Sequence, residues 1–159
     1  MLAARAAFVR DVVAPALREG RVMVSDRFDF STFAYQGYGR GLPLDRIRVL
    51  NDFATGGLRP DLVLVLDLPA GQGRARQIGA GKEEDRIEAA GVDFLDRVAA
   101  GYRTLGAEEP HARLVDATPE VEVVQEALRR ILVDHFPEPL GAGRGSTTTE
   151  PSNPRTDAP

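Results

Sequence analysis

The sequence predicts an α/β fold with a parallel sheet, because short apolar runs alternate with stretches of helical periodicity. The clearest strand is residues 62–66, Leu-Val-Leu-Val-Leu, in which apolar residues do not alternate with polar ones. Such a run is typical of a parallel strand that is covered on both faces. Residues 113–116, Arg-Leu-Val-Asp, predict a further short strand. The length of 159 residues suits one domain and is too small for two ordinary ones.

The first elements expected along the chain are a helix and a strand. Residues 2–13 place apolar side chains at helical spacing. Pro15 should kink or restart this helix, because proline cannot donate a backbone hydrogen bond, and Gly20 is a plausible stop. Residues 21–25, Arg-Val-Met-Val-Ser, then predict a buried strand with Asp26-Arg27 at its carboxyl end.

Two helices with a glycine-rich loop between them are predicted next. Residues 29–35 form a short helix, and Gly37, Gly39 and Gly41 indicate a loop. A second helix covers residues 44–54 and ends at Gly56-Gly57. Its expected buried face consists of Leu44, Ile47, Leu50 and Ala54.

The second half of the chain should contain two more helices and a tail. Residues 70–84 are rich in glycine and arginine and are expected to be mobile. A capping-box pattern at 85–88 opens a helix that runs to about Leu105, and Pro119 starts a helix that extends through Leu132. Residues 137–159 are rich in proline and threonine and predict a disordered tail, which leaves 1–136 as the folded domain.

Composition excludes several classes of function. The net charge of −4 gives no general attraction to nucleic acid or to an anionic membrane. The absence of cysteine rules out disulfide scaffolds and thiol nucleophiles, and two histidines make a histidine metal cage implausible. No apolar run is long enough to span a bilayer. Charged residues interrupt the first apolar run, so no secretory signal is expected and a cytoplasmic location follows.

The segment that follows Ser25 has the composition of a nucleotide site. Five of the ten aromatic residues lie between Phe28 and Tyr38. Aromatic rings stack on a base, the planar fork of Arg27 suits phosphate oxygens, and the Asp26 carboxylate suits Mg²⁺. Composition leaves one alternative open, in which these aromatics only fill the core along an amphipathic helix. Ligands of parallel sheets bind beyond the carboxyl ends of the strands, where Asp67 and Asp116 are also expected.

The motifs in this region resemble the bacterial thymidylate kinase family. The resemblance spans about residues 1–133, in the order of the family. It is carried by Asp26-Arg27-Phe28, Ser31-Thr32, Ala34-Tyr35-Gln36-Gly37, Leu50-Asn51, Gly57-Leu58-Arg59-Pro60-Asp61, Leu66-Asp67-Leu68-Pro69, Asp85-Arg86-Ile87-Glu88, Gly101-Tyr102 and Asp116-Ala117. It implies a three-layer P-loop nucleoside monophosphate kinase fold and a homodimer.

The resemblance also implies a reaction, the transfer of the γ-phosphate of ATP to dTMP with Mg²⁺. In such a site Arg27 binds the dTMP phosphate, Asp26 lies near the metal and the phosphates, and Arg5 approaches the thymine ring. Substrate-lining positions fall on Ser31, Thr32, Tyr35 and Gln36. Arg74 and Arg76 fall in the family's lid over ATP, with Arg76 as a catalytic candidate; the alternative for both is a solvated loop.

One motif of the family is missing from the sequence. The family begins with a strand and the phosphate-binding loop Gly-x-x-x-x-Gly-Lys-Ser/Thr. Residues 79–82, Gly-Ala-Gly-Lys, fail this pattern, because Arg76 and Glu83 occupy positions that need glycine and a hydroxyl residue. We therefore expect a chain truncated at its start, in which residues 21–25 and 62–66 have unpaired edges and which does not phosphorylate dTMP alone. The alternatives are a non-catalytic nucleotide-binding remnant and a kinase of another nucleoside monophosphate.

Overall fold

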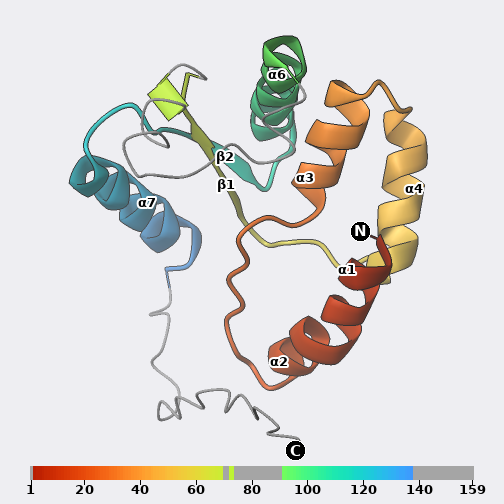
Figure 1. The fold of residues 1–159 in the computed structure, drawn as a ribbon. Coiled ribbons are helices and arrows are strands. Elements are labelled where there is room, and N and C mark those ends of the chain that lie inside the picture. Colours follow the sequence, from red (N-terminus) through yellow and green to blue (C-terminus); the bar gives the residue numbers. More distant parts are fainter. Residues whose placement is uncertain (1, 70–71, 74–90, 138–159) are drawn as a thin grey trace, which may run out of the picture.

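The computed structural model describes residues 2–69, 72–73 and 91–137. The helices labelled α are α-helical and those labelled η are π-helical, with wider turns (Figure 1). The elements in chain order are α1 (Leu2–Phe8), η1 (Val9–Val13), α2 (Ala14–Arg18), α3 (Asp29–Thr32), η2 (Phe33–Gly39), α4 (Leu44–Thr55), β1 (Val63–Asp67), α6 (Val92–Glu108), β2 (Ala112–Asp116) and α7 (Val121–His135).

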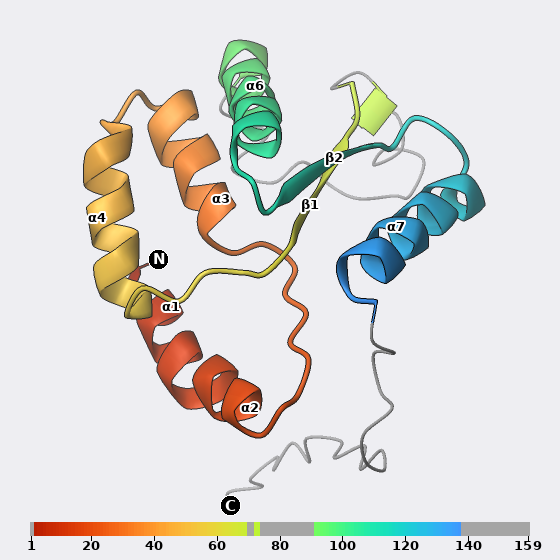
Figure 2. The same ribbon diagram turned by 180° about the vertical axis from the view of Figure 1, so that it is seen from behind.

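The sheet in the described residues consists of β1 and β2, which are parallel as predicted. Their register pairs Val63 with Ala112 at one end and Asp67 with Asp116 at the other. We expected both faces of β1 to be covered by other elements, but Leu66 is 55% exposed, so the cover is incomplete. Helix α6 packs against both strands, whereas α7 packs against β2 (Figure 2). The α7 side of β1 is therefore left partly open.

The strand predicted at residues 21–25 is absent. This segment is extended but pairs with no strand in the described part of the chain, and Val22 and Val24 are 62% and 90% exposed. A strand requires a neighbouring backbone for its hydrogen bonds, and an apolar run does not supply one. Within the described residues β1 also pairs along one edge only, with β2.

The N-terminal helical segments follow the sequence prediction. Pro15 lies in the first turn of α2, directly after the π-helical turn η1. The Ala14 N–H donates to the Val9 carbonyl, five residues back. This wider turn accommodates Pro15, which has no backbone N–H to donate. After α2 the chain turns at Gly20, which has a φ of 72°. Hydrogen bonds from Gly20 to Leu17 and from Arg21 to Ala16 complete this helix end.

The loop predicted at Gly37 and Gly39 is helical instead, since η2 continues to Gly39. A Cβ atom at Gly39 would lie 2.7 Å from Phe94 Cε2 and 2.8 Å from Val98 Cγ2, both on α6. The glycine therefore permits close helix packing rather than a turn. Sequence spacing alone does not distinguish these two uses of glycine.

Helix α4 has the predicted extent, but its buried face is rotated from the predicted one. Ile47, Asn51 and Thr55 are the buried residues, whereas the side chain of Leu50 is 51% exposed. Apolar spacing missed Asn51 because a hydrogen bond, rather than hydrophobicity, holds this side chain inside. The helix ends at Gly56, which is left-handed with a φ of 64°.

The remaining helix boundaries differ modestly from expectation. Helix α6 extends to Glu108, beyond the predicted end at Leu105. Helix α7 begins at Val121, so Pro119 precedes it by two residues. Of the segment 70–84 only Gln72 and Gly73 are described, and both donate to the Pro69 carbonyl. The lid residues Arg74 and Arg76, the capping box at 85–88 and all of the predicted tail except Pro137 lie outside the described residues. No helix in the described ranges is both long and apolar enough to cross a membrane.

The hydrophobic core lies where η2, α6 and the sheet meet. Helix η2 makes its main packing contact with α6, and α4 covers the far side of η2 (Figure 1). The buried core residues are Phe30, Phe33, Ala34, Ile47, Val65, Phe94, Val98, Leu105 and Ala112. This core holds α3 and η2 in place, and the predicted site residue Tyr35 packs at its margin together with Tyr102.

Candidate nucleotide site

The predicted site residues form two neighbouring clusters at the start of the helix made by α3 and η2. One cluster contains Arg27, in the bend before α3, and Ser31 and Tyr35 on the helix; Arg27 is hydrogen-bonded to Tyr35, and Ser31 to Tyr102. The other contains Arg5 and Thr32. The structure thus brings five of the predicted residues together in two hydrogen-bonded groups.

Arg27 has an exposed guanidinium that is held against an aromatic ring. Its Nη1 donates to the Tyr35 hydroxyl at 3.1 Å, and its Cζ lies 5.5 Å from the centre of the Tyr35 ring. The hydrogen bond with Tyr35 raises the pKa of the Arg27 guanidinium. The remaining donors of this planar fork are available to an anion.

The backbone at Arg27 is unusual. Its φ is 67°, in the left-handed region that side chains other than glycine seldom adopt. The Ser25 hydroxyl donates to the Arg27 carbonyl at 2.9 Å and supports this turn. Such backbone strain is frequently found where a functional side chain must be aimed.

Tyr102 completes the Arg27 cluster from α6. Its hydroxyl lies 2.7 Å from Ser31 Oγ, and its ring meets the Tyr35 ring edge to face, with centres 6.3 Å apart. Burial raises the pKa of Tyr102. The sequence analysis did not place Tyr102 in the site; helical spacing with the buried Val98 and Leu105 is the signal that points it inward.

Arg5 is the centre of the second cluster. Its Nη2 donates to the Phe28 carbonyl at 2.7 Å and to Thr32 Oγ1 at 2.8 Å, while Nη1 donates to Asn51 Oδ1. Its Cζ lies 5.4 Å from the centre of the Phe28 ring. Burial lowers the pKa of Arg5, an effect that the Asp29 charge opposes, but an arginine stays charged in a protein.

Two predicted site residues, Asp26 and Gln36, belong to neither hydrogen-bonded cluster. Asp26 is exposed, and its charge contributes to the raised pKa of Arg27. Gln36 is half-buried, and its backbone carbonyl accepts a hydrogen bond from Leu42 at 3.0 Å. The described residues contain no group of three or more acidic or histidine side chains placed to hold a metal ion. A single exposed carboxylate still fits Mg²⁺, which keeps several waters and binds substrate phosphates as its other ligands.

The aspartates at the carboxyl edge of the sheet already have protein partners. Asp67 pairs with Arg103 Nε at 2.8 and 3.0 Å. Asp116 accepts from the Thr118 N–H and hydroxyl, and these bonds lower the pKa of its carboxyl. Asp26 and Arg27 do not end a strand in this structure, so the expectation that all four residues follow strand ends is met by Asp67 and Asp116 only.

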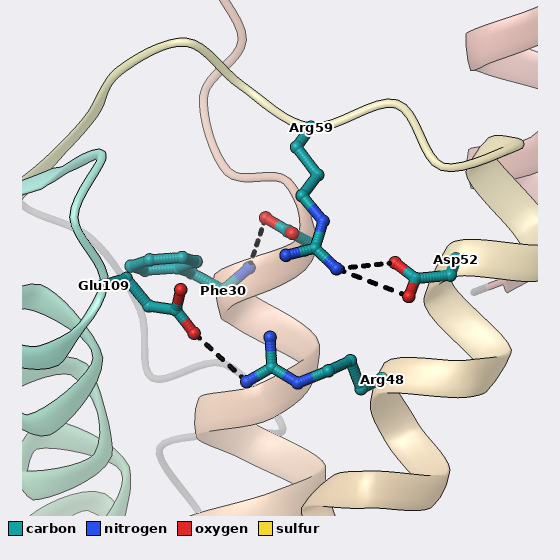
Figure 3. Close-up of polar contacts among 6 residues, drawn as sticks. Phe30, Arg48, Asp52, Arg59 and Glu109 are labelled. Atoms are coloured by element: carbon teal, nitrogen blue, oxygen red, sulfur yellow. Dashed lines mark hydrogen bonds and ion pairs between the residues drawn. The ribbon is translucent and has the colours of Figure 1, made fainter.

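A shallow hollow behind the Arg5 cluster was not foreseen. In Figure 3, Arg48 and Arg59 extend toward the space between α3 and α4. Arg48 pairs with Glu109 at 3.1 Å, and Arg59 pairs with Asp52 at 3.3 Å. Asp29, Phe30, Phe33, Asn51 and His111 complete the lining of this hollow.

Asp29 yields a testable dependence of stability on pH. Burial raises the pKa of its carboxyl, although the Phe30 N–H and the Arg5 charge oppose the shift. The folded protein therefore holds the Asp29 proton more tightly, and this stabilisation is lost as pH rises through the folded-state pKa. We expect the free energy of unfolding of the wild type, minus that of Asp29→Asn, to increase as pH falls from about 7 to about 4. Urea unfolding at several pH values measures it.

Asp116→Asn is the matched control, because the pKa of Asp116 is lowered rather than raised. The corresponding difference for this variant should decrease as pH falls. Equal slopes for the two variants would contradict the assignment of the pH dependence to Asp29.

The fold and the two clusters by themselves indicate a class of protein. The structure has parallel strands with aspartates at one edge of the sheet, and an exposed arginine that is held on an aromatic ring. Both features are typical of α/β proteins that bind phosphorylated ligands. A comparison with family models gives the particular family. The model described as thymidylate kinase matches residues 1–128, and the chain belongs to this family. The P-loop nucleoside monophosphate kinase fold follows from this membership.

Curated relatives agree with this assignment. The chain is 48% identical over 127 residues to a thymidylate kinase of Desulforudis audaxviator, covering 79% of this chain and 57% of the relative. It is 48% identical over 133 residues to one of Desulfovibrio desulfuricans, covering 78% and 61%. A thymidylate kinase of Neisseria meningitidis is 42% identical over 137 residues, covering 86% and 66%. The chain thus spans about three fifths of the length of these relatives.

Proposed function

We propose that the protein is a thymidylate kinase, which transfers the γ-phosphate of ATP to dTMP and forms dTDP. The observation that carries this proposal is the Arg27 fork, which is exposed, hydrogen-bonded to Tyr35 and flanked by the Asp26 carboxylate. The family membership and the names of the relatives support the same activity.

The proposed roles follow from the chemistry of the side chains. Phosphoryl transfer requires mainly positioning and neutralisation of charge. Arg27 binds the dTMP phosphate through its free donors, and Tyr35 limits the rotation of its guanidinium. Asp26 is the proposed Mg²⁺ ligand; the ion, when bound, neutralises charge on the phosphates. Arg74 and Arg76 are proposed lid residues that contact ATP, with Arg76 catalytic, and both lie outside the described residues.

Residues of both clusters, together with Gln36, are proposed to face the nucleoside. Arg5 approaches the thymine ring, and Ser31, Thr32, Tyr35 and Gln36 line the base and the sugar. Hydroxyl and amide groups recognise the edges of a base by hydrogen bonds, and aromatic rings stack on its face. The Ser31 hydroxyl shares its hydrogen bond with Tyr102, which anchors this side of the site to α6.

A homodimer is proposed on the α4 side of the molecule. Val49, Leu50 and Phe53 on α4 are 68%, 51% and 89% exposed, which is unusual for large apolar side chains grouped on one helix. Sedimentation equilibrium of the chain tests this association. The cytoplasmic location and the division into a domain of residues 1–136 and a tail stay predictions.

Ligand selectivity tests the proposed function. Calorimetric titration of the chain with dTMP, dUMP, dCMP and AMP should show the tightest binding for dTMP. Incubation of dTMP with ATP and Mg²⁺, analysed for dTDP by chromatography, tests the transfer step itself. Tighter binding of another monophosphate would assign the protein to a different substrate. Nucleotide binding that is never accompanied by transfer, even with the phosphate-binding region of a relative joined to the chain, would favour a non-catalytic role.

A further inference from the structure

Asn51 occupies a position where an amide side chain is not expected. It lies on the buried face of α4 and is 3% exposed. Its Oδ1 accepts a hydrogen bond from Arg5 Nη1, although the two residues are 46 positions apart in the sequence. Its Nδ2 is buried and has no hydrogen-bond partner among the residues that the structure describes. A buried amide donor without a partner destabilises the folded state.

This cost implies that Asn51 is not present for stability alone. An apolar side chain of similar shape would remove the unpartnered donor, and replacement of a buried polar group in this way can be neutral or stabilising. Among the described residues the Asn51 side chain has one hydrogen bond, and its partner is Arg5. This bond sets the orientation of the amide, with the oxygen toward Arg5.

Besides Asn51, the hydrogen bonds of Arg5 within the described residues all start from one nitrogen, and its Cζ lies 5.4 Å from the centre of the Phe28 ring. The Phe28 carbonyl and Thr32 Oγ1 both accept from Nη2. Asn51 Oδ1 is the acceptor for Nη1. Without Asn51 the planar group would be held at one nitrogen and could turn about that anchor. With Asn51 it is held at two nitrogens, from α3 on one side and from α4 on the other.

We propose that Asn51 is a positioning residue that fixes the Arg5 guanidinium for recognition of the nucleoside. Asn51 acts through Arg5 and does not itself contact the nucleotide. This inference rests on the proposed function, in which Arg5 approaches the thymine base.

The test compares two equally buried polar residues on one face of α4. Asn51→Leu removes the acceptor of Arg5 and keeps the branched four-atom skeleton of the side chain. Thr55→Val is the matched control, because Thr55 lies one turn further along, is 5% exposed, and has a buried Oγ1 without a partner. Asn51→Leu should weaken the binding of both dTMP and thymidine about tenfold, and by the same factor, because the effect is on the nucleoside side. Thr55→Val should bind both ligands like the wild type.

A double-mutant cycle separates positioning from a general structural effect. In the Arg5→Ala background, Asn51→Leu should cause no further loss of dTMP affinity, since the residue through which it acts is gone. An equal loss in both backgrounds would overturn the proposal, and so would wild-type affinity in Asn51→Leu alone.

A measurement without ligand distinguishes failure of this proposal from failure of the proposed function. The Nε–H resonance of Arg5, assigned by its loss in Arg5→Ala, should be sharp in the wild type and in Thr55→Val, and broadened in Asn51→Leu. An unchanged resonance in Asn51→Leu would show that Asn51 does not position Arg5. If the wild type binds no thymidine nucleotide while this resonance responds as expected, the proposed function fails but Asn51 still positions Arg5.

Discussion

Replacing Arg27 with alanine is expected to weaken the binding of dTMP about a hundredfold while thymidine binds almost as before. Two charge-assisted hydrogen bonds from the guanidinium to a phosphate contribute about 1.5–3 kcal/mol each when well formed, and the exposure of Arg27 reduces this through solvent screening. Thymidine carries no phosphate and does not use this fork. Calorimetric titration of both ligands at one fixed salt concentration measures the difference.

Arg21→Ala is the matched control for Arg27→Ala. Arg21 lies on the same extended segment, is also exposed, and pairs with Glu19 at 2.7 Å. Its loss should leave both affinities unchanged, which excludes a general effect of removing positive charge. Arg27→Lys should recover only part of the affinity, because an ammonium group lacks the planar fork. Wild-type binding of dTMP by Arg27→Ala would show that another residue holds the phosphate.

Truncation of Phe94 to alanine is expected to lower the free energy of unfolding by about 3–5 kcal/mol. Phe94 is 9% exposed and belongs to the core in which α6 packs against η2. Its ring centre lies 6.2 Å from that of Tyr35, so the loss of this ring also removes support from the Arg27 cluster. A decrease of this size is a large part of the stability of a small domain. Urea unfolding monitored by circular dichroism measures it.

Val92→Ala is the control within the same helix. Val92 is the first residue of α6 and is 63% exposed, so its truncation should change the free energy of unfolding by less than about 0.5 kcal/mol. A loss below about 1 kcal/mol for Phe94→Ala would mean that the contact between α6 and η2 contributes little to the core.

The local sequence pattern predicted the helices and strands of this chain better than it predicted which elements pack or pair with them. The runs at 62–66 and 113–116 form parallel strands. A strand that packs against α6 needs apolar residues, and both runs contain them. The run at 21–25 also has an apolar centre, Val-Met-Val, but it pairs with no strand in the described part of the chain. The difference between them is the presence of a neighbouring backbone, which composition does not encode.

Gly39 and Asn51 show the same limit of prediction from the local sequence. Gly39 was expected in a loop and instead lies in a helix, where it allows contact with Phe94 and Val98. Asn51 was absent from the predicted buried face of α4, because hydrophobic spacing gives no weight to an amide. Both positions were decided by a side chain from another element, at a distance that no sequence window covers.

The sequence by itself determined the family and the shared helical face of Ser31 and Tyr35, because residues four apart lie on one side of a helix. Only the tertiary structure decided which distant residues complete the site: Tyr102 beside Ser31, and Asn51 beside Arg5. Helical periodicity sets the direction of a side chain within its own element. The partner that it meets depends on how close-packed elements pass one another, and that arrangement is a property of the whole folded chain.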